Sequence, residues 1–357
     1  MSHFFTSRHE RGMRHLLLAA VSVIAACNPV SQGDVFATLP AEVVTTTDAG
    51  TPCTPLQDRA NWPVRVVFVV QNSGAMCVVD PPGSQGAAGF CEQVASSLPN
   101  TGTTPGRIGA IQRFFSDNKT RTNLSAAIVG YGTNPTVIPF TPVTLGVPNG
   151  VAALQSNLAK GSNLQGALEA TKTLIEQDVQ NTPASIRARS RYVVVVLSTG
   201  IPFPRCSTND SLAVYASAAN PALTWSDSLG AGTYCNSVMP SDPDFITGFT
   251  AGGDLNQNAQ LFGLVDGMLA LDAQYGLGDV RVFTRLLMND ANLAACGPIC
   301  QDLFGSNTSF ADTRTMGTWL LTQLATRGQG TFADPGTPAM LSLSSVDTNE
   351  FTTFCGP

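Results

Sequence analysis

The chain has 357 residues and is acidic, with 19 Lys and Arg against 25 Asp and Glu and a formal net charge of −6. Hydrophobic residues make up 43% of it and charged residues only 12%, so it can bury a sizeable core under a surface of mostly neutral polar side chains. The acidic balance argues against nucleic acid as a partner, because phosphate binding needs clustered Lys and Arg.

Residues 1–26 have the layout of a secretory signal peptide. Scattered arginines precede the apolar run 16–26, and small residues lie just before Cys27. The apolar run is shorter than the roughly 20 residues that a membrane-spanning helix needs, which favours a cleaved signal over a membrane span. Met1 and Met13 are alternative starts for this signal.

The letters IAAC at 24–27 resemble the lipobox of bacterial lipoproteins. The resemblance implies that Cys27 is acylated and that the chain touches the cell-envelope membrane only through its lipid. Asn28 is not the aspartate associated with inner-membrane retention, which favours the outer membrane over the inner. Scattered Pro, Thr and Ala predict a flexible tether, so 27–52 would link the anchor to a folded domain at 53–357. A cleaved signal followed by an incidental cysteine is the alternative.

The folded part begins as alternating strands and helices. A continuous β-branched run predicts a strand buried on both faces at 64–70, and further buried strands are expected at 192–197 and 280–287. A hairpin is expected from 123–131 and 136–140, and a short strand at 331–333. Apolar spacing predicts helices at 107–117, 151–158, 163–178, 256–275, 313–326 and 345–354. The pattern predicts an α/β fold with a doubly wound, mostly parallel sheet of about six strands and helices on both faces.

Three segments, in order, resemble von Willebrand factor A-like (integrin I-like) domains: VVFVVQNSGAM at 66–76, GSNLQGALEATKTLI at 161–175 and RYVVVVLSTGIP at 191–202. In that family, carboxylates and hydroxyls at these places form a metal-ion-dependent adhesion site for Mg²⁺. The corresponding positions here are Gln71, Ser73, Ala75, Ser162 and Thr199.

The metal site is therefore degenerate. Gln71 and Thr199 stand where the family has carboxylates, and Ala75 stands where it has a hydroxyl. Because Mg²⁺ is usually held by one or two carboxylates, we expect no metal and no other cofactor here. The cleft would be neutral, although these residues could equally just close the ends of the strands. A separate Ca²⁺ site remains open from aspartates of the long loops, namely Asp80, Asp242, Asp244 and Asp254.

Three long connections, 71–105, 198–255 and 288–312, follow the strands 64–70, 192–197 and 280–287 and should emerge on one rim. Loops of such length are usually functional or disordered. The eight cysteines left after Cys27 predict four disulfides, because an even set in an exported chain is typical of disulfide bonding. We pair them by position as Cys77–Cys91, Cys206–Cys235, Cys296–Cys300 and Cys53–Cys355. Such stapled loops favour a binding surface, with mere stabilisation of the loops as the alternative. A zinc site is the competing interpretation of these thiols, and no histidine accompanies them.

The histidines all lie in the signal, at His3, His9 and His15, so the mature chain has none. This excludes a Ser-His-Asp triad, a Cys-His pair and imidazole-ligated metals. We interpret the protein as a non-catalytic, membrane-anchored binding or adhesion lipoprotein that recognises a protein or polysaccharide through the loop rim. One alternative is a structural scaffold of an envelope adhesion or motility complex. Another is an enzyme with two acidic catalytic residues, such as a glycosidase.

Overall fold

The computed structural model describes residues 53–55, 62–81, 98, 104–154, 161–202, 256–296, 310–349 and 353–355. They fall into two compact units, a main unit from Leu56 to Thr352 and a second unit made of the flanking N- and C-terminal segments. The signal, Cys27 and the whole tether up to residue 52 lie outside the described residues.

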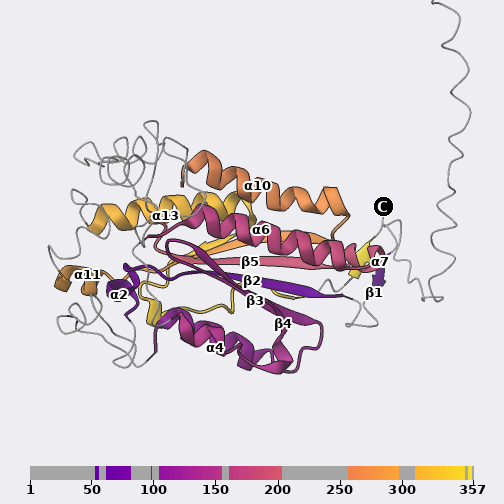
Figure 1. Cartoon of the computed structure of the whole chain (residues 1–357), viewed down its shortest axis with the longest axis horizontal. Coiled ribbons are helices and arrows are strands. Elements are labelled where there is room, and N and C mark those ends of the chain that lie inside the picture. Colours follow the sequence, from indigo (N-terminus) through magenta and orange to yellow (C-terminus); the bar gives the residue numbers. More distant parts are fainter. Residues whose placement is uncertain are drawn as a thin grey trace, which may run out of the picture. The chain divides into compact units, whose positions relative to one another are not determined.

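The main unit is built on a six-stranded sheet with the strand order β4-β3-β2-β5-β6-β7 (Figure 1). Its strands are β2 (Val64–Gln71), β3 (Leu124–Tyr131), β4 (Pro135–Pro142), β5 (Arg191–Ser198), β6 (Asp279–Leu286) and β7 (Gln329–Ala333). All neighbours pair in parallel except β3 and β4, which form the antiparallel hairpin. The predicted doubly wound, mostly parallel sheet is confirmed.

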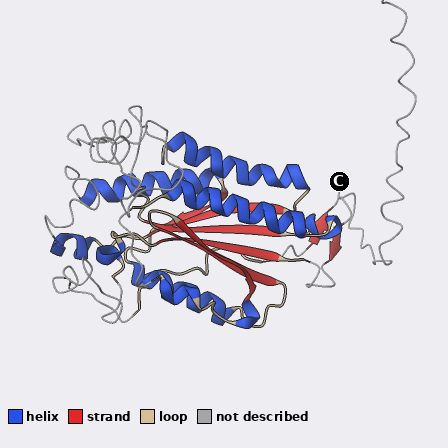
Figure 2. Cartoon of the chain, viewed as in Figure 1, coloured by secondary structure: helices blue, strands red, loops and turns tan. Residues whose placement is uncertain are grey.

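Helices cover both faces of this sheet (Figure 2). On one face lie α6 (Leu164–Asn181), α10 (Asn258–Tyr275) and α13 (Phe310–Arg327), and on the other lies α4 (Gly106–Asp117). Shorter turns are α2 (Met76–Val79), η2 (Val143–Leu145), α5 (Gly150–Ala153), α7 (Ala184–Arg187), α11 (Asp290–Cys296) and η4 (Pro338–Met340). The long helices begin and end close to their predicted positions. Of the helix predicted over 151–158, the described residues contain the single turn α5, and 155–158 lie outside them. No helix in the described part of the chain is long and apolar enough to cross a membrane.

The central strands are apolar on both sides because helices pack on both. Every residue of β5 is buried, and β2 is buried at all positions except Arg65. On the α4 side, the Phe68 ring meets the Phe114 ring edge-on with centroids 5.0 Å apart. This two-sided burial accounts for the unbroken β-branched runs, which a sheet with one solvated face would not need.

Residues 341–349, which we call the strap, follow η4 and form neither helix nor strand. The helix predicted over 345–354 is therefore wrong. Side chains of the strap bond its own backbone instead: the Asn349 N–H donates to the Asp347 carboxylate at 3.1 Å, and the Ser344 N–H donates to the Ser342 hydroxyl at 3.3 Å. Short polar side chains compete with helical hydrogen bonds in this way.

Four arginines from separate parts of the domain hold the strap. The Arg113 guanidinium donates to the Leu341 carbonyl, and the Arg285 guanidinium donates to the Ser345 hydroxyl. Arg191 donates to the Asp347 carboxylate and the Asn349 carbonyl, and Arg121 donates to the Thr348 carbonyl. Leu341 and Val346 add apolar contacts, being 1% and 6% exposed. Specific polar bonds thus take the place of secondary structure in this segment.

The second unit contains a two-stranded antiparallel sheet of β1 (Cys53–Pro55) and β8 (Thr353–Cys355). In its register Cys53 lies opposite Cys355. Opposite residues of antiparallel strands have Cα atoms about 4.5–5.5 Å apart, which is within the range that a disulfide spans. The backbone therefore brings together the two cysteines of one predicted pair, and the bond itself stays a prediction.

Candidate functional site

The candidate site lies where β2 and β5 end, and Gln71 links the two strand ends. The Gln71 Oε1 atom accepts three hydrogen bonds, from the Thr199 backbone N–H at 2.7 Å, the Thr199 hydroxyl at 3.1 Å and the Ser198 hydroxyl at 3.1 Å. Gln71 is 1% exposed and Thr199 is fully buried. The amide therefore joins the ends of two adjacent parallel strands, and its acceptor oxygen is fully occupied.

The other end of the amide points to Ser73. The Gln71 Nε2 group donates to the Ser73 hydroxyl at 2.8 Å. A backbone N–H can only donate, so the Thr199 N–H must face the oxygen of the Gln71 side-chain amide. The NH₂ group of that amide therefore points toward Ser73. A cation approaching the Ser73 hydroxyl would meet the positive edge of an NH₂ group.

The network continues from Ser198 to β3 and to the next loop. The Tyr131 hydroxyl and the Gly200 backbone N–H both donate to the Ser198 hydroxyl at 2.9 Å. Burial raises the pKa of Tyr131 well above its usual value near 10, so its phenol stays protonated. Gly200 has a φ of 72°, and a Cβ atom there would lie 2.4 Å from the Gly317 carbonyl oxygen of α13. The loop that leaves β5 is therefore pressed against a helix backbone.

Two of the five predicted site positions stand apart from this network. Ser162 is 5% exposed, and its hydroxyl has no hydrogen-bond partner within the described residues. Ala75 is 6% exposed and lies at the N-terminal boundary of the single turn α2, where its side chain makes no capping bond. The structure thus links Gln71, Ser73 and Thr199 directly and places the other two at neighbouring buried loop positions without a bond to them.

The residues present do not fit the Mg²⁺ that the resemblance implies. Two groups replace the carboxylates of the family. Gln71 presents its NH₂ group toward Ser73 and its oxygen is already occupied, and the Thr199 hydroxyl donates to Gln71 and accepts from the Ile201 N–H at 3.3 Å. In the described ranges no group of three or more His, Cys, Asp or Glu side chains is placed to hold a metal. These buried residues therefore form a neutral, hydrogen-bonded floor at the strand ends.

Asp80, which the sequence offered as a Ca²⁺ ligand, is a structural anchor instead. Its carboxylate accepts from the Gly106 N–H at 2.6 Å, from the Arg107 N–H at 3.1 Å and from the Arg107 guanidinium at 2.8 Å. Arg107 is fully buried, and it also donates to the carbonyl of Leu154. A basic residue in the first turn of a helix opposes the helix dipole, and this was the sequence signal for a carboxylate partner nearby. The other three candidate Ca²⁺ ligands lie outside the described residues.

The sequence patterns also did not predict that the N-terminus of α6 is joined to the start of α10. The Asn163 side chain accepts from the Gly166 N–H at 3.0 Å, as an N-cap residue does. Asn256, which lies just before α10, accepts from the Gln165 N–H at 2.9 Å and in turn donates its own N–H to the Gln165 side chain at 2.7 Å. Two helices that follow different strands are therefore locked together beside the candidate site.

Cysteines flank this floor on α2 and α11. Cys77 and Cys296 are each in a disulfide bond. The two short helices touch, since the Asn292 side chain donates to the Val78 carbonyl at 2.9 Å. Their expected partners, Cys91 and Cys300, and the pair Cys206–Cys235 lie outside the described residues, so the pairing stays a prediction.

No protein-family model and no curated protein matches the chain. Among solved structures, the PilB minor pilin from Streptococcus sanguinis is similar over 80% of this chain and 60% of that chain, with 18% identity and a TM-score of 0.41. The vWF domain of a type V pili tip protein from Porphyromonas gingivalis is similar over 78% of this chain and 91% of that chain, with 13% identity and a TM-score of 0.37. The chain spans only about 60% of the length of the minor pilin. At this level of likeness, the strand order described above is what defines the fold.

Proposed function

We propose that the protein is a non-catalytic, lipid-anchored binding protein of the cell envelope that recognises a protein or polysaccharide through its loop rim. The loop rim consists of the three connections that follow β2, β5 and β6. The observation that carries the proposal is topological, because these strands are neighbours at the middle of the sheet and all three connections leave from their carboxyl ends. Ligands of open α/β sheets bind beyond that edge.

The floor under the rim supports binding rather than catalysis. Gln71, Ser73, Ser198 and Thr199 are neutral, and they hydrogen-bond to one another, to the Tyr131 hydroxyl and to the Gly200 N–H. The only titratable group in the network is Tyr131, and burial keeps its phenol protonated near neutral pH. A general acid or base needs a pKa near the working pH, which this network does not supply.

The cysteines support a shaped rim. Each of the three connections carries two of them, and Cys77 and Cys296 are disulfide-bonded. Disulfides within a connection would restrict its conformations before a partner arrives, which lowers the entropic cost of association. The pairs Cys77–Cys91 and Cys296–Cys300 belong to this proposal.

The test is binding of the purified intact chain to arrays of polysaccharides and to envelope proteins solubilised from the same cells. Trp225 and Tyr234 lie in the connection after β5, and aromatic side chains often anchor interfaces. Replacing both by Ala should weaken binding while the melting temperature stays unchanged. Leu145→Ser is the matched control, since Leu145 is 75% exposed on η2, away from the carboxyl ends of the strands.

Three outcomes separate the candidates. Saturable binding to a glycan or a defined protein, lost in the aromatic variant and kept in the control, supports recognition through the rim. Stable co-purification of several envelope proteins from both variants would favour the scaffold. Hydrolysis of an arrayed glycan would contradict the non-catalytic assignment.

A further inference from the structure

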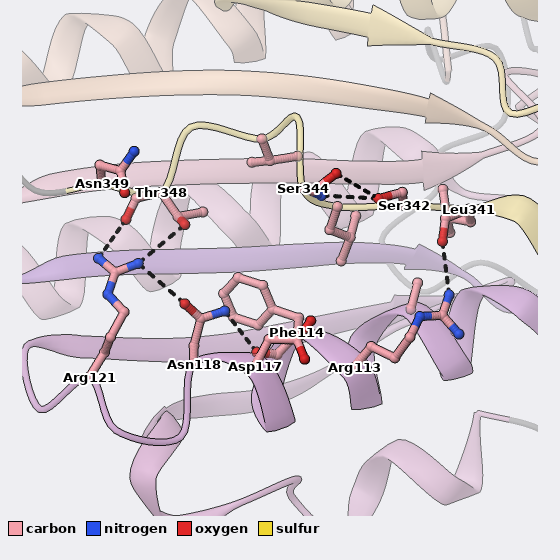
Figure 3. Close-up of a pocket in the computed structure, with 13 residues that line it drawn as sticks. Arg113, Phe114, Asp117, Asn118, Arg121, Leu341, Ser342, Ser344, Thr348 and Asn349 are labelled. Atoms are coloured by element: carbon pink, nitrogen blue, oxygen red, sulfur yellow. Dashed lines mark hydrogen bonds between the residues drawn. The ribbon is translucent and has the colours of Figure 1, made fainter.

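A pocket of about 340 Å³ lies on the α4 side of the sheet, between α4 with its following turn and the strap (Figure 3). It belongs to the main unit and does not include the carboxyl ends of the strands, so it is separate from the loop rim. Its volume is at the small end of the range for ligand sites, enough for about one ring.

Both ends of the pocket are tied by arginines. At one end the Arg113 guanidinium donates to the Leu341 carbonyl at 2.9 Å, and at the other the Arg121 guanidinium donates to the Thr348 carbonyl at 2.7 Å (Figure 3). The strap is thereby held at both ends against α4. A ligand would meet walls that are already in place, which lowers the cost of binding.

Two opposite charges face this pocket without pairing. Arg113 and Asp117 are four residues apart on α4, a spacing at which opposite charges commonly pair, yet no ion pair joins them. Asp117 makes no hydrogen bond or ion pair with any residue in the described ranges. Within the described residues the Arg113 guanidinium makes one hydrogen bond, to the Leu341 carbonyl, so most of its N–H donors remain available.

The other lining residues provide hydrogen-bonding groups that can both donate and accept, and an apolar surface. Asn349 contributes an amide, and Ser342 and Ser344 contribute hydroxyls that bond each other at 2.8 Å. Phe114 and Val346, each 6% exposed, form apolar surface. An inorganic anion would leave the carboxylate of Asp117 facing a like charge, and a purely apolar ligand would strip water from both charges.

We propose that this pocket binds an acidic sugar residue of a polysaccharide. The sugar carboxylate pairs with the Arg113 guanidinium, since two parallel N–H donors match a carboxylate. The sugar hydroxyls donate to Asp117 and form hydrogen bonds with the polar side chains of the strap. The C–H face of the sugar ring packs on Phe114 and Val346. An amino acid or a peptide C-terminus suits the pocket less well, because its ammonium group needs several acceptors and Asp117 is the only carboxylate among the lining residues.

The test is titration calorimetry on the purified intact chain with glucuronate, galacturonate, the neutral sugars glucose and galactose, acetate and the dipeptide Gly-Gly. The uronates should bind saturably and at least about tenfold more tightly than the other ligands. Arg113→Gln should lower the affinity for the preferred uronate by about tenfold or more, as expected for the loss of a charge-assisted hydrogen bond. Arg327→Gln is the matched control, because Arg327 forms an exposed ion pair with Asp266 on another helix.

Hydrogen exchange on the unmodified chain keeps the test decisive if Arg113→Gln fails to fold. Uronate should then slow exchange in peptides that cover 110–121 and 341–349. Equal or tighter binding of acetate, neutral sugar or dipeptide overturns the proposal, as do absent uronate binding and protection confined to the loop rim. An unchanged affinity in a folded Arg113→Gln variant overturns it as well.

Discussion

Removal of the Asp80 carboxylate is the most informative perturbation of the fold. Asp80→Ala would leave the Arg107 guanidinium, which is fully buried, without its counter-ion and would remove the acceptor for the first N–H groups of α4. Breaking a buried ion pair by deleting one partner costs about 3–5 kcal/mol. The free energy of unfolding of most domains is only about 5–15 kcal/mol, so this single change should consume a large share of the stability.

Urea unfolding of the intact chain, followed by circular dichroism, measures this loss. Its midpoint should fall with little change in slope. Asp266→Ala is the matched control, because it removes the same group from an ion pair whose side chains are 43% and 54% exposed. Such a pair contributes about 0–1 kcal/mol.

A double-mutant cycle tests the stated cause. Arg107→Met removes the buried charge, so the double variant Asp80→Ala/Arg107→Met should lose at least about 1 kcal/mol less than the sum of the two single losses. A cost for Asp80→Ala within about 1 kcal/mol of the control, or additive losses in the double variant, would refute the argument that an orphaned charge dominates.

Four further outcomes follow from the structure and the sequence. The melting midpoint should be the same in Mg²⁺, Mn²⁺ and a chelator, whereas a bound metal at a hundredfold excess over Kd would raise the free energy of unfolding by about 2.7 kcal/mol. A Mg²⁺ shift that disappears in Ser73→Ala would contradict the neutral, metal-free site. Because burial raises the pKa of Tyr131, its contribution to stability is complete below pH about 10 and is lost as the pH rises further, so ultraviolet titration should show this phenol ionising only with alkaline unfolding. Cys27→Ser should abolish acyl labelling and release the chain from the membrane fraction, and unchanged fractionation would rule out the anchor. Non-reducing peptide mapping should recover a Cys53–Cys355 peptide, and any other partner for Cys53 would contradict the pairing.

The sheet was predictable because burial on both faces leaves a strong local signal. The runs in β2 and β5 are almost continuously apolar, and only a sheet covered on both sides needs them. The signal in β6 is weaker, because Arg281 and Arg285 interrupt its apolar residues. The order of the three similar segments also placed Gln71 and Thr199 at neighbouring strand ends, where they do meet. Short-range pattern and topology together were enough for this part of the site.

The strap was not predictable, because its structure depends on distant residues. Arg191 and Asp347 are 156 positions apart, and Arg113 and Leu341 are 228 apart. Spacing of apolar residues in a short window cannot reveal that guanidinium groups will take the backbone carbonyls. Arg107 in the first turn of α4 signalled a carboxylate partner, but the sequence did not identify Asp80 as that partner, because the two residues lie 27 positions apart.

The strap also has a consequence for the order in which the chain folds. It is held by side chains of α4, the turn after it, β5 and β6, so its docking site exists only once those elements have assembled. Contacts between segments so far apart along the chain carry a large loop-closure cost and form slowly. We therefore expect the strap to dock late in folding. Until it docks, the groove beside α4 is open, and limited proteolysis during refolding should cut residues 341–349 before they become protected.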